Sequence, residues 1–354
     1  MPRIETIPAD IARFEMGRRV KLFESEFQRR IDDPAARKAA LGPLQAAVGG
    51  FFSGRFERVA EQLDAARFAI AGKSDPAQQW AAGLALLPER RLVTAGSKPI
   101  AGRLVAFTAA AATSVPPGTV LEIGSRRIPV ERLPAVFEVS ANLKPEPVRL
   151  RVAGKVVDEW RSPVQAIPNL ERRLETLRRH PAGKSTRDRT IADTVAGMDF
   201  ALSGKCPENE PDYGLWLERA ERAARPGGQV ADKPGDWRLV LDAGNGTPVR
   251  LYIPDGPERP RPLVVALHGA GGSENLYFEA YGAGRIVEMC RQRGWLLVAP
   301  RTGSALPSAV TDAVAALTPV DTKRVFLTGH SMGAMAGAMG VQAAPGRFAA
   351  VALL

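Results

Sequence analysis

The sequence has few cysteines and no long apolar run. Its 354 residues contain two cysteines, Cys206 and Cys290, too few for a disulfide framework and without CxxC or zinc-ligand spacing. We therefore expect two core thiols, no metal site and no cofactor. No stretch approaches the ~18 to 20 apolar residues of a membrane helix, and residues 1–30 carry Arg and Glu without the apolar core of a signal peptide. We expect no membrane span, and we favour a cytoplasmic location.

The chain has an excess of basic residues, with 48 Lys and Arg against 38 Asp and Glu, a net charge of +10. The basic residues are scattered, and no helix-turn-helix, RNP or zinc-finger pattern accompanies them. The densest run, 172–189, is interrupted by acidic residues such as Glu175 and Asp188. We interpret it as a solvated helix face and expect no nucleic-acid partner; an RNA-binding surface is the alternative.

Residues 1–90 have the periodicity of helices, which predicts a helical bundle. One apolar stripe steps by four and three residues from Phe52 to Ile70, as on one face of a helix. Asp33-Pro34 and Asp75-Pro76 each place a capping carboxylate before a proline, a pattern typical of helix starts.

Residues 91–165 have a different pattern, with short runs of period two separated by Pro- and Gly-rich turns. The segments 119–123, 135–139 and 148–152 are β-prone, which favours a small antiparallel sandwich. Residues 166–235 predict a spacer of helices and loops, with Leu170, Leu174 and Leu177 on one helical face that ends before Pro181.

The last part of the chain, 236–354, predicts an α/β domain. A hairpin is expected around Asn245-Gly246, because a type I′ turn needs positive φ at both central residues. Continuous apolar runs typical of buried parallel strands follow, with helical stretches between them, and this alternation predicts a doubly wound sheet. The apolar runs are 263–267, 295–299, 325–328 and 349–354.

Two motifs follow two of these strands. Gly329-His330-Ser331-Met332-Gly333 comes directly after the strand 325–328, and His268-Gly269-Ala270-Gly271-Gly272 comes after the strand 263–267. Open α/β sheets place their active sites at these strand ends. The first motif has the form of a nucleophile elbow, in which a strained turn holds Ser331 clear of the sheet.

Residues 237–354 resemble the first half of a serine-dependent α/β-hydrolase of the esterase, polyhydroxybutyrate-depolymerase and prolyl-oligopeptidase-like group. The run from Asp321 to Gly333 carries most of the resemblance. It implies that Ser331 is the acyl nucleophile and that the N–H groups of Met332 and Ala270 hold the oxyanion. Gly329, His330, Gly333, His268 and Gly269 would support the two motifs, with His268 in a structural role.

The resemblance also implies an acid and a histidine after the serine. The 23 residues after Ser331 contain no His, Asp or Glu, and a serine hydroxyl without a base is a poor nucleophile at neutral pH. Neither His330, the neighbour of Ser331, nor His180 is expected to reach the hydroxyl. We therefore expect a C-terminally truncated and inactive form of a longer enzyme.

Two functional hypotheses follow. The first is a serine hydrolase of small carboxylic esters, or of peptides, in which residues 1–235 restrict access or dock the substrate. The second is a binding or scaffold protein with a vestigial hydrolase half-domain, whose apolar edge strand would need a cover. The sequence does not determine the oligomeric state.

Overall fold

The computed structural model describes residues 6–72, 74–209 and 211–354, whose contacts form two compact units. The first comprises residues 1–172 and 198–211, and the second residues 173–197 and 212–354. The N-terminal helices and the β-rich segment share the first unit, and the boundaries at 90, 165 and 235 expected from the sequence stay predictions.

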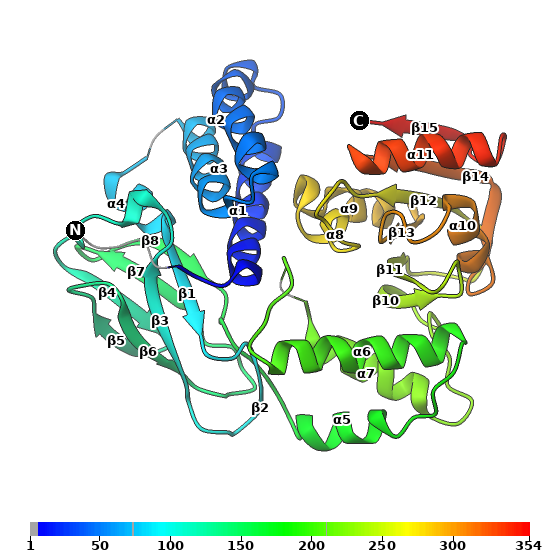
Figure 1. Ribbon diagram of the computed structural model, residues 1–354, viewed down its shortest axis with the longest axis horizontal. Helices are drawn as coiled ribbons and strands as arrows, with labels where there is room; N and C mark the ends of the chain where they lie inside the picture. The colour runs from blue at the N-terminus through cyan, green and yellow to red at the C-terminus, as the bar shows by residue number, and fades with distance from the viewer. Residues whose placement is uncertain (1–5, 73, 210) are drawn as a thin grey trace. The chain divides into compact units, whose positions relative to one another are not determined.

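The first unit begins with four helices (Figure 1), which are α1 (Ala9–Arg29), α2 (Pro34–Phe52), α3 (Phe56–Ala71) and α4 (Pro76–Ala82). Both predicted caps are present: Asp33 accepts hydrogen bonds from the first turn of α2, and Asp75 forms a capping box with Gln78. The predicted stripe from Phe52 to Ile70 is wrong at its start. Phe52 ends α2 and is 74% exposed, because the chain turns at 53–55 before α3 begins.

The rest of this unit contains two antiparallel sheets around one apolar core. The three-stranded sheet has the order β1-β3-β6 and the four-stranded sheet the order β5-β4-β7-β8, while β2 and β9 form a separate parallel pair. Leu84, Leu104 and Phe137 of one sheet share a core cluster with Leu121 and Leu150 of the other. The expected small sandwich is therefore present, and its first strand precedes residue 91. The bounds are β1 (Leu84–Pro88), β2 (Leu92–Thr94), β3 (Ile100–Ala106), η1 (Ala109–Ala111), β4 (Thr119–Ile123), β5 (Arg126–Pro129), β6 (Ala135–Val139), β7 (Val148–Val152), β8 (Lys155–Trp160) and β9 (Gln165–Ile167).

Three helices lead to the second sheet. They are α5 (Leu170–Arg178), α6 (Thr186–Leu202) and α7 (Tyr213–Ala224). The three leucines expected on one face of α5 are all buried. The turn between α5 and α6 is closed by Asp188, which accepts hydrogen bonds from Ser185 and pairs with His180 at 3.0 Å. These partners hold the pKa of Asp188 down at about 2.

The second unit is built on a six-stranded sheet with the order β10-β11-β13-β12-β14-β15, in which β12 to β15 run parallel (Figure 1). Alternate residues of its strands face opposite sides. Val264 and Leu297 lie in a core cluster with Tyr277 and Cys290 from α8 and α9, and Leu267 packs near α11 on the other face. The predicted α/β fold with helices on both faces is confirmed. The bounds are β10 (Gly235–Leu241), β11 (Thr247–Ile253), β12 (Arg261–Leu267), α8 (Leu276–Glu279), η2 (Tyr281–Gly284), α9 (Arg285–Arg293), β13 (Leu296–Pro300), α10 (Pro307–Ala315), β14 (Val320–Gly329), α11 (Met332–Ala343) and β15 (Ala350–Leu353).

The hairpin of β10 and β11 is present, but the turn expected at Asn245-Gly246 is wrong. The last strand pair is Leu241 with Thr247, so the loop has the five residues 242–246. Positive φ occurs at Gly244 and Gly246 and not at Asn245. Because the Gly246 N–H bonds the Ala243 carbonyl and the Thr247 hydroxyl bonds the same carbonyl, the longer loop closes on Ala243.

Candidate functional site

Ser331 lies in the tight turn between β14 and α11. Its backbone has φ 54° and ψ −119°, a region that costs a non-glycine residue ~1 to 3 kcal/mol. The turn is held by its neighbours: His330 N–H donates to Leu267 O at 3.0 Å, and Ser331 N–H donates to Leu354 O at 2.8 Å. The strained turn predicted for an elbow is therefore present, and the Ser331 residue is exposed.

Two glycines allow this turn to fit against the sheet. A Cβ placed on Gly333 would lie 2.1 Å from Leu267 O and 2.7 Å from His268 O, and one on Gly329 would lie 2.4 Å from Gly333 O. All these neighbours are backbone atoms, which cannot rotate away. The first turn of α11 thus approaches the end of β12 at a distance that only glycine permits.

The loop after β12 lies against the serine. A Cβ on Gly269 would lie 3.3 Å from the Ser331 Cβ and 3.0 Å from the His330 Nδ1. Among the described residues, the N–H groups of Met332 and Ala270 have no hydrogen-bond acceptor. The two motifs named from the sequence therefore meet, and each brings one unpaired backbone donor.

His268 is buried and joins this loop to the loop after β13. The Thr302 N–H donates to His268 Nε2 at 3.0 Å, so this nitrogen is the acceptor and the proton lies on Nδ1, which donates to Gly269 O at 2.8 Å. The Thr302 hydroxyl also donates to His268 O at 2.8 Å. With both ring nitrogens engaged, His268 orients the loop and is not available as a base.

An ion network around the buried Glu274, in the segment after β12, was not anticipated from the sequence. Glu274, 1% exposed, accepts three hydrogen bonds from Arg301 at 3.0 to 3.1 Å, and Arg238 lies 3.8 Å away. Asn275 accepts from Arg250, whose guanidinium also pairs with Asp236. Glu274 lies in the segment after β12, and Arg301 comes directly after β13. Their positions after neighbouring parallel strands are the one feature of the sequence from which this ion pair could have been predicted.

The two other histidines have different surroundings. His330 is exposed, and its Nδ1 lies 3.3 Å from the hydroxyl of Tyr281, whose ring packs edge-on against the imidazole. His180 pairs with Asp188 in the α5–α6 turn.

The carboxylates near the motif in sequence are also engaged elsewhere. Asp312 pairs with Arg347. The Arg324 guanidinium donates to Asp321 at 2.6 Å and holds the pKa of that carboxyl below its usual value.

In the described ranges, metal ligands, cysteines and apolar helices provide no further candidate for a functional site. They contain no group of three or more His, Cys, Asp or Glu residues that could hold a metal ion. Both cysteines are free and buried, and burial raises the pKa of each thiol to about 12. None of the helices described here combines the length and hydrophobicity needed to cross a bilayer.

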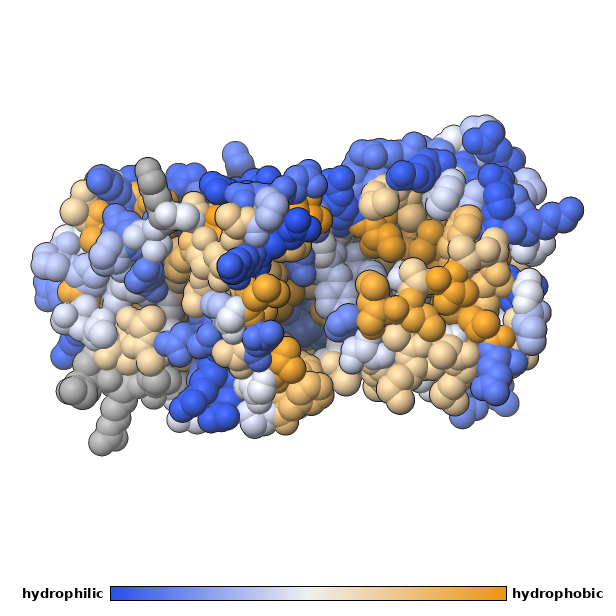
Figure 2. All heavy atoms as spheres, turned by 90° about the horizontal axis from the view of Figure 1, so that it is seen from above, coloured by the Kyte–Doolittle hydropathy of each residue, from blue (hydrophilic) through white to orange (hydrophobic). Residues whose placement is uncertain are grey.

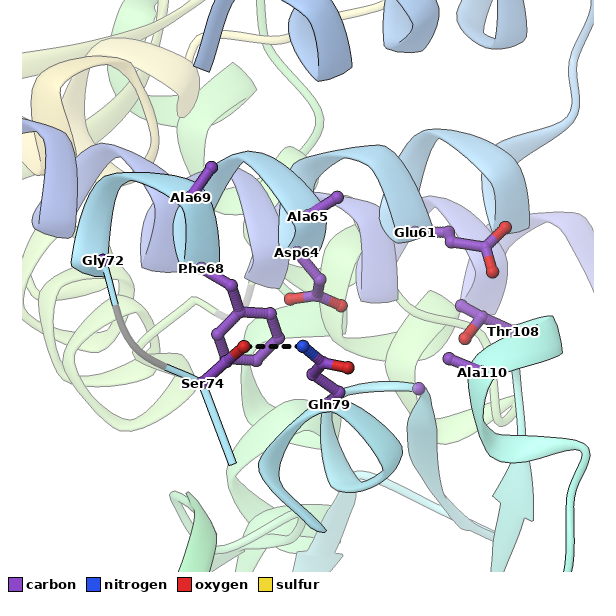
Figure 3. A pocket seen from close by; sticks show the side chains of 11 residues that line it. Glu61, Asp64, Ala65, Phe68, Ala69, Gly72, Ser74, Gln79, Thr108 and Ala110 are labelled. Carbon is purple, nitrogen blue, oxygen red and sulfur yellow. Dashed lines mark hydrogen bonds between the residues drawn. The ribbon is translucent and has the colours of Figure 1, made fainter. Parts of the chain in front are cut away.

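A cavity of about 480 Å³ lies in the first unit, between α3, α4 and η1 (Figure 3). Asp64 and Glu61 line it together with Phe68, Gln79 and Thr108. Asp64 is already paired with Arg19 at 2.9 Å and with Arg67 at 3.4 Å. The cavity contains none of the site residues expected from the sequence.

Apolar side chains are exposed on α11 and β15, over the orange area on the right of Figure 2. All four residues of β15 are exposed, and this strand ends the sheet. The exposed large residues of this face are Met332, Met335, Met339, Val351, Leu353 and Leu354.

Comparison with known proteins finds solved structures but no family. No family model matches the chain, and no curated protein matches it. An S-formylglutathione hydrolase from Staphylococcus aureus is 17% identical, over 29% of this chain and 48% of that one, with a TM-score of 0.25. An acetyl xylan esterase from Aspergillus awamori is 21% identical, over 30% of this chain and 45% of that one, with a TM-score of 0.26.

A poly(3-hydroxybutyrate) depolymerase from Bordetella parapertussis is also 21% identical, over 34% of this chain and 51% of that one, with a TM-score of 0.26. The chain spans about half the length of these three structures. The three are described as a hydrolase, an esterase and a depolymerase.

Proposed function

We propose that the second unit carries the nucleophile and the oxyanion hole of a serine hydrolase that acts on carboxylic esters. The observation that carries this proposal is the meeting of the two motifs, with the strained Ser331 next to Gly269. Unpaired N–H groups at Met332 and Ala270, one from each motif, would stabilise negative charge on a carbonyl oxygen bound between them. Peptides are the alternative substrates, since the same chemistry cleaves amides.

In this reaction the Ser331 Oγ adds to the carbonyl carbon, its proton passes to a solvent water molecule, and the two N–H groups bind the oxyanion. Collapse of the tetrahedral species expels the alcohol and leaves an ester on Ser331, which water then hydrolyses. The engaged nitrogens of His268 and the Asp188 partner of His180 argue against either as the base. We therefore propose that the 354-residue chain retains only the contribution of the oxyanion hole and binding, about 10³- to 10⁴-fold over water.

The test is covalent labelling with a fluorophosphonate, followed by peptide mass spectrometry, together with p-nitrophenyl acetate hydrolysis. We expect a slow adduct on Ser331 that is absent in Ser331→Ala. Ser304→Ala is the matched control, because the exposed Ser304 hydroxyl bonds only the nearby Arg301 carbonyl. Equal labelling of wild type and Ser331→Ala would refute the nucleophile assignment.

A binding role is the second candidate, and the exposed apolar face of α11 and β15 favours it. In this case Ser331 would have no chemical role. Neither an adduct on Ser331 nor hydrolysis above the Ser331→Ala background would then be observed.

A further inference from the structure

The outer face of α2 in the first unit is apolar and uncharged along most of its length. Leu41, Val48 and Phe52 are 55%, 56% and 74% exposed, and spacings of seven and four residues place them on one side of the helix. They span ~16 Å at 1.5 Å per residue. Single exposed apolar residues are ordinary, but an aligned row marks a contact surface.

The orientation of α2 is fixed by its opposite face. Ala36, Ala40 and Ala47 are buried there, and a Cβ on Gly50 would lie 3.0 Å from Val59 of α3. On the outer side, Cβ atoms added at residues 42 and 49 would meet nothing within 4 Å. The side of α2 that packs in the core is therefore the opposite one, and the row of Leu41, Val48 and Phe52 faces solvent.

Basic residues flank the row at both ends. Arg37 and Lys38 precede Leu41, Arg55 follows Phe52, and all three are exposed. Residues 34–56 contain no Asp or Glu. No carboxylate of the described chain forms an ion pair with these three side chains.

This charge pattern selects among possible partners. In a parallel pair of two copies, Arg37 and Lys38 would face their own counterparts, and in an antiparallel pair they would face Arg55, so both arrangements oppose like charges. A lipid bilayer with anionic headgroups accepts the basic residues and also offers an apolar layer for Leu41, Val48 and Phe52.

We propose that α2 docks flat on an anionic lipid surface. Leu41, Val48 and Phe52 enter the boundary between headgroups and acyl chains, and Arg37, Lys38 and Arg55 contact the headgroup phosphates. Docking involves only the first unit and is independent of the chemistry proposed at Ser331.

The test is co-sedimentation of the full chain with vesicles of phosphatidylcholine alone or with added phosphatidylglycerol. We expect binding only with the anionic lipid, and weaker binding as salt rises. Phe52→Ser should lower the partition coefficient about tenfold, and Arg37→Gln/Lys38→Gln by a similar factor or more. Val136→Ser is the matched control, since Val136 is 67% exposed on β6, and its binding should equal that of wild type.

Circular dichroism and thermal unfolding must show that each variant is folded. Equal binding to both vesicle types would overturn the proposal, as would a loss in Val136→Ser as large as that in Phe52→Ser. Phe52-dependent dimerisation without vesicles would instead assign the face to a second copy. Phe52-dependent binding of soluble polyglutamate, with no gain on vesicles, would assign it to an acidic polypeptide.

Discussion

Replacing Gly333 with alanine should destabilise the second unit and displace Met332, one of the two proposed oxyanion donors. The added methyl carbon would lie 2.1 Å from Leu267 O and 2.7 Å from His268 O, whereas C···O contacts normally exceed ~3.3 Å. The first turn of α11 must therefore retreat from β12 by about 1 Å. Overpacking costs ~1 to 3 kcal/mol when side chains can adjust, and here the obstacles are backbone atoms.

The expected change in the free energy of unfolding of Gly333→Ala is the sum of two opposing contributions. A helical Gly→Ala change gains about 1 kcal/mol in propensity, and a clash at the upper end of the range costs about 3 kcal/mol, so we expect a loss of about 2 kcal/mol. The same retreat would shift the Met332 N–H, one of the two donors proposed for the oxyanion. Labelling of Ser331 by a fluorophosphonate should then slow about 10²-fold.

Urea unfolding followed by tryptophan fluorescence measures the first effect. Gly49→Ala is the matched control, because this residue is helical and a Cβ there meets nothing within 4 Å. It should leave stability unchanged or raise it by up to ~1 kcal/mol. If Gly333→Ala lies within 0.5 kcal/mol of wild type, a margin of about the usual effect of a surface change, the account of the close approach is wrong.

Two further predictions concern groups with shifted pKa values. Asp188→Asn should remove a contribution of about 1 kcal/mol from a half-buried site. Because the folded-state pKa of Asp188 is lowered to about 2, this contribution is present above the unfolded value of about 4 and is lost as pH falls toward 2. Unfolding curves between pH 7 and 2 should therefore converge for variant and wild type at the acid end, and a constant gap would contradict the assignment. Cys206 and Cys290, with pKa values of about 12, should react with iodoacetamide at pH 8 about 10³-fold more slowly than a free thiol. Both should react at the ordinary rate in denaturant, and rapid labelling of the native chain would show that they are accessible.

Much of the second unit could be predicted because its signals are local. The apolar runs of β12 and β13 are buried on both faces of the strand. The glycine-flanked Ser331 directly follows β14 and predicts a tight turn. The caps at Asp33 and Asp75 are also local, since each carboxylate bonds backbone N–H groups within three residues. The helix and strand periods fixed these elements without reference to the rest of the chain.

Two local details were missed. A turn at 53–55 separates Phe52, the start of the predicted stripe, from α3, and the hairpin loop has five residues, closed by the bond from the Gly246 N–H to the Ala243 carbonyl. Features that depend on distant residues could not be predicted from local periods. The grouping of the N-terminal helices with the β-rich segment depends on contacts between sequence-distant residues.

The sequence alone thus determined the elements, the two motifs and the identity of Ser331 as the candidate nucleophile. Only the tertiary structure placed Gly269 beside Ser331, fixed the proton of His268 through Thr302, and buried Glu274 against Arg301. Neighbouring residues decide a turn or a cap, whereas the approach of Gly269 to Ser331 and the ion pair of Glu274 with Arg301 require strands that are far apart in sequence to end at the same edge of a sheet.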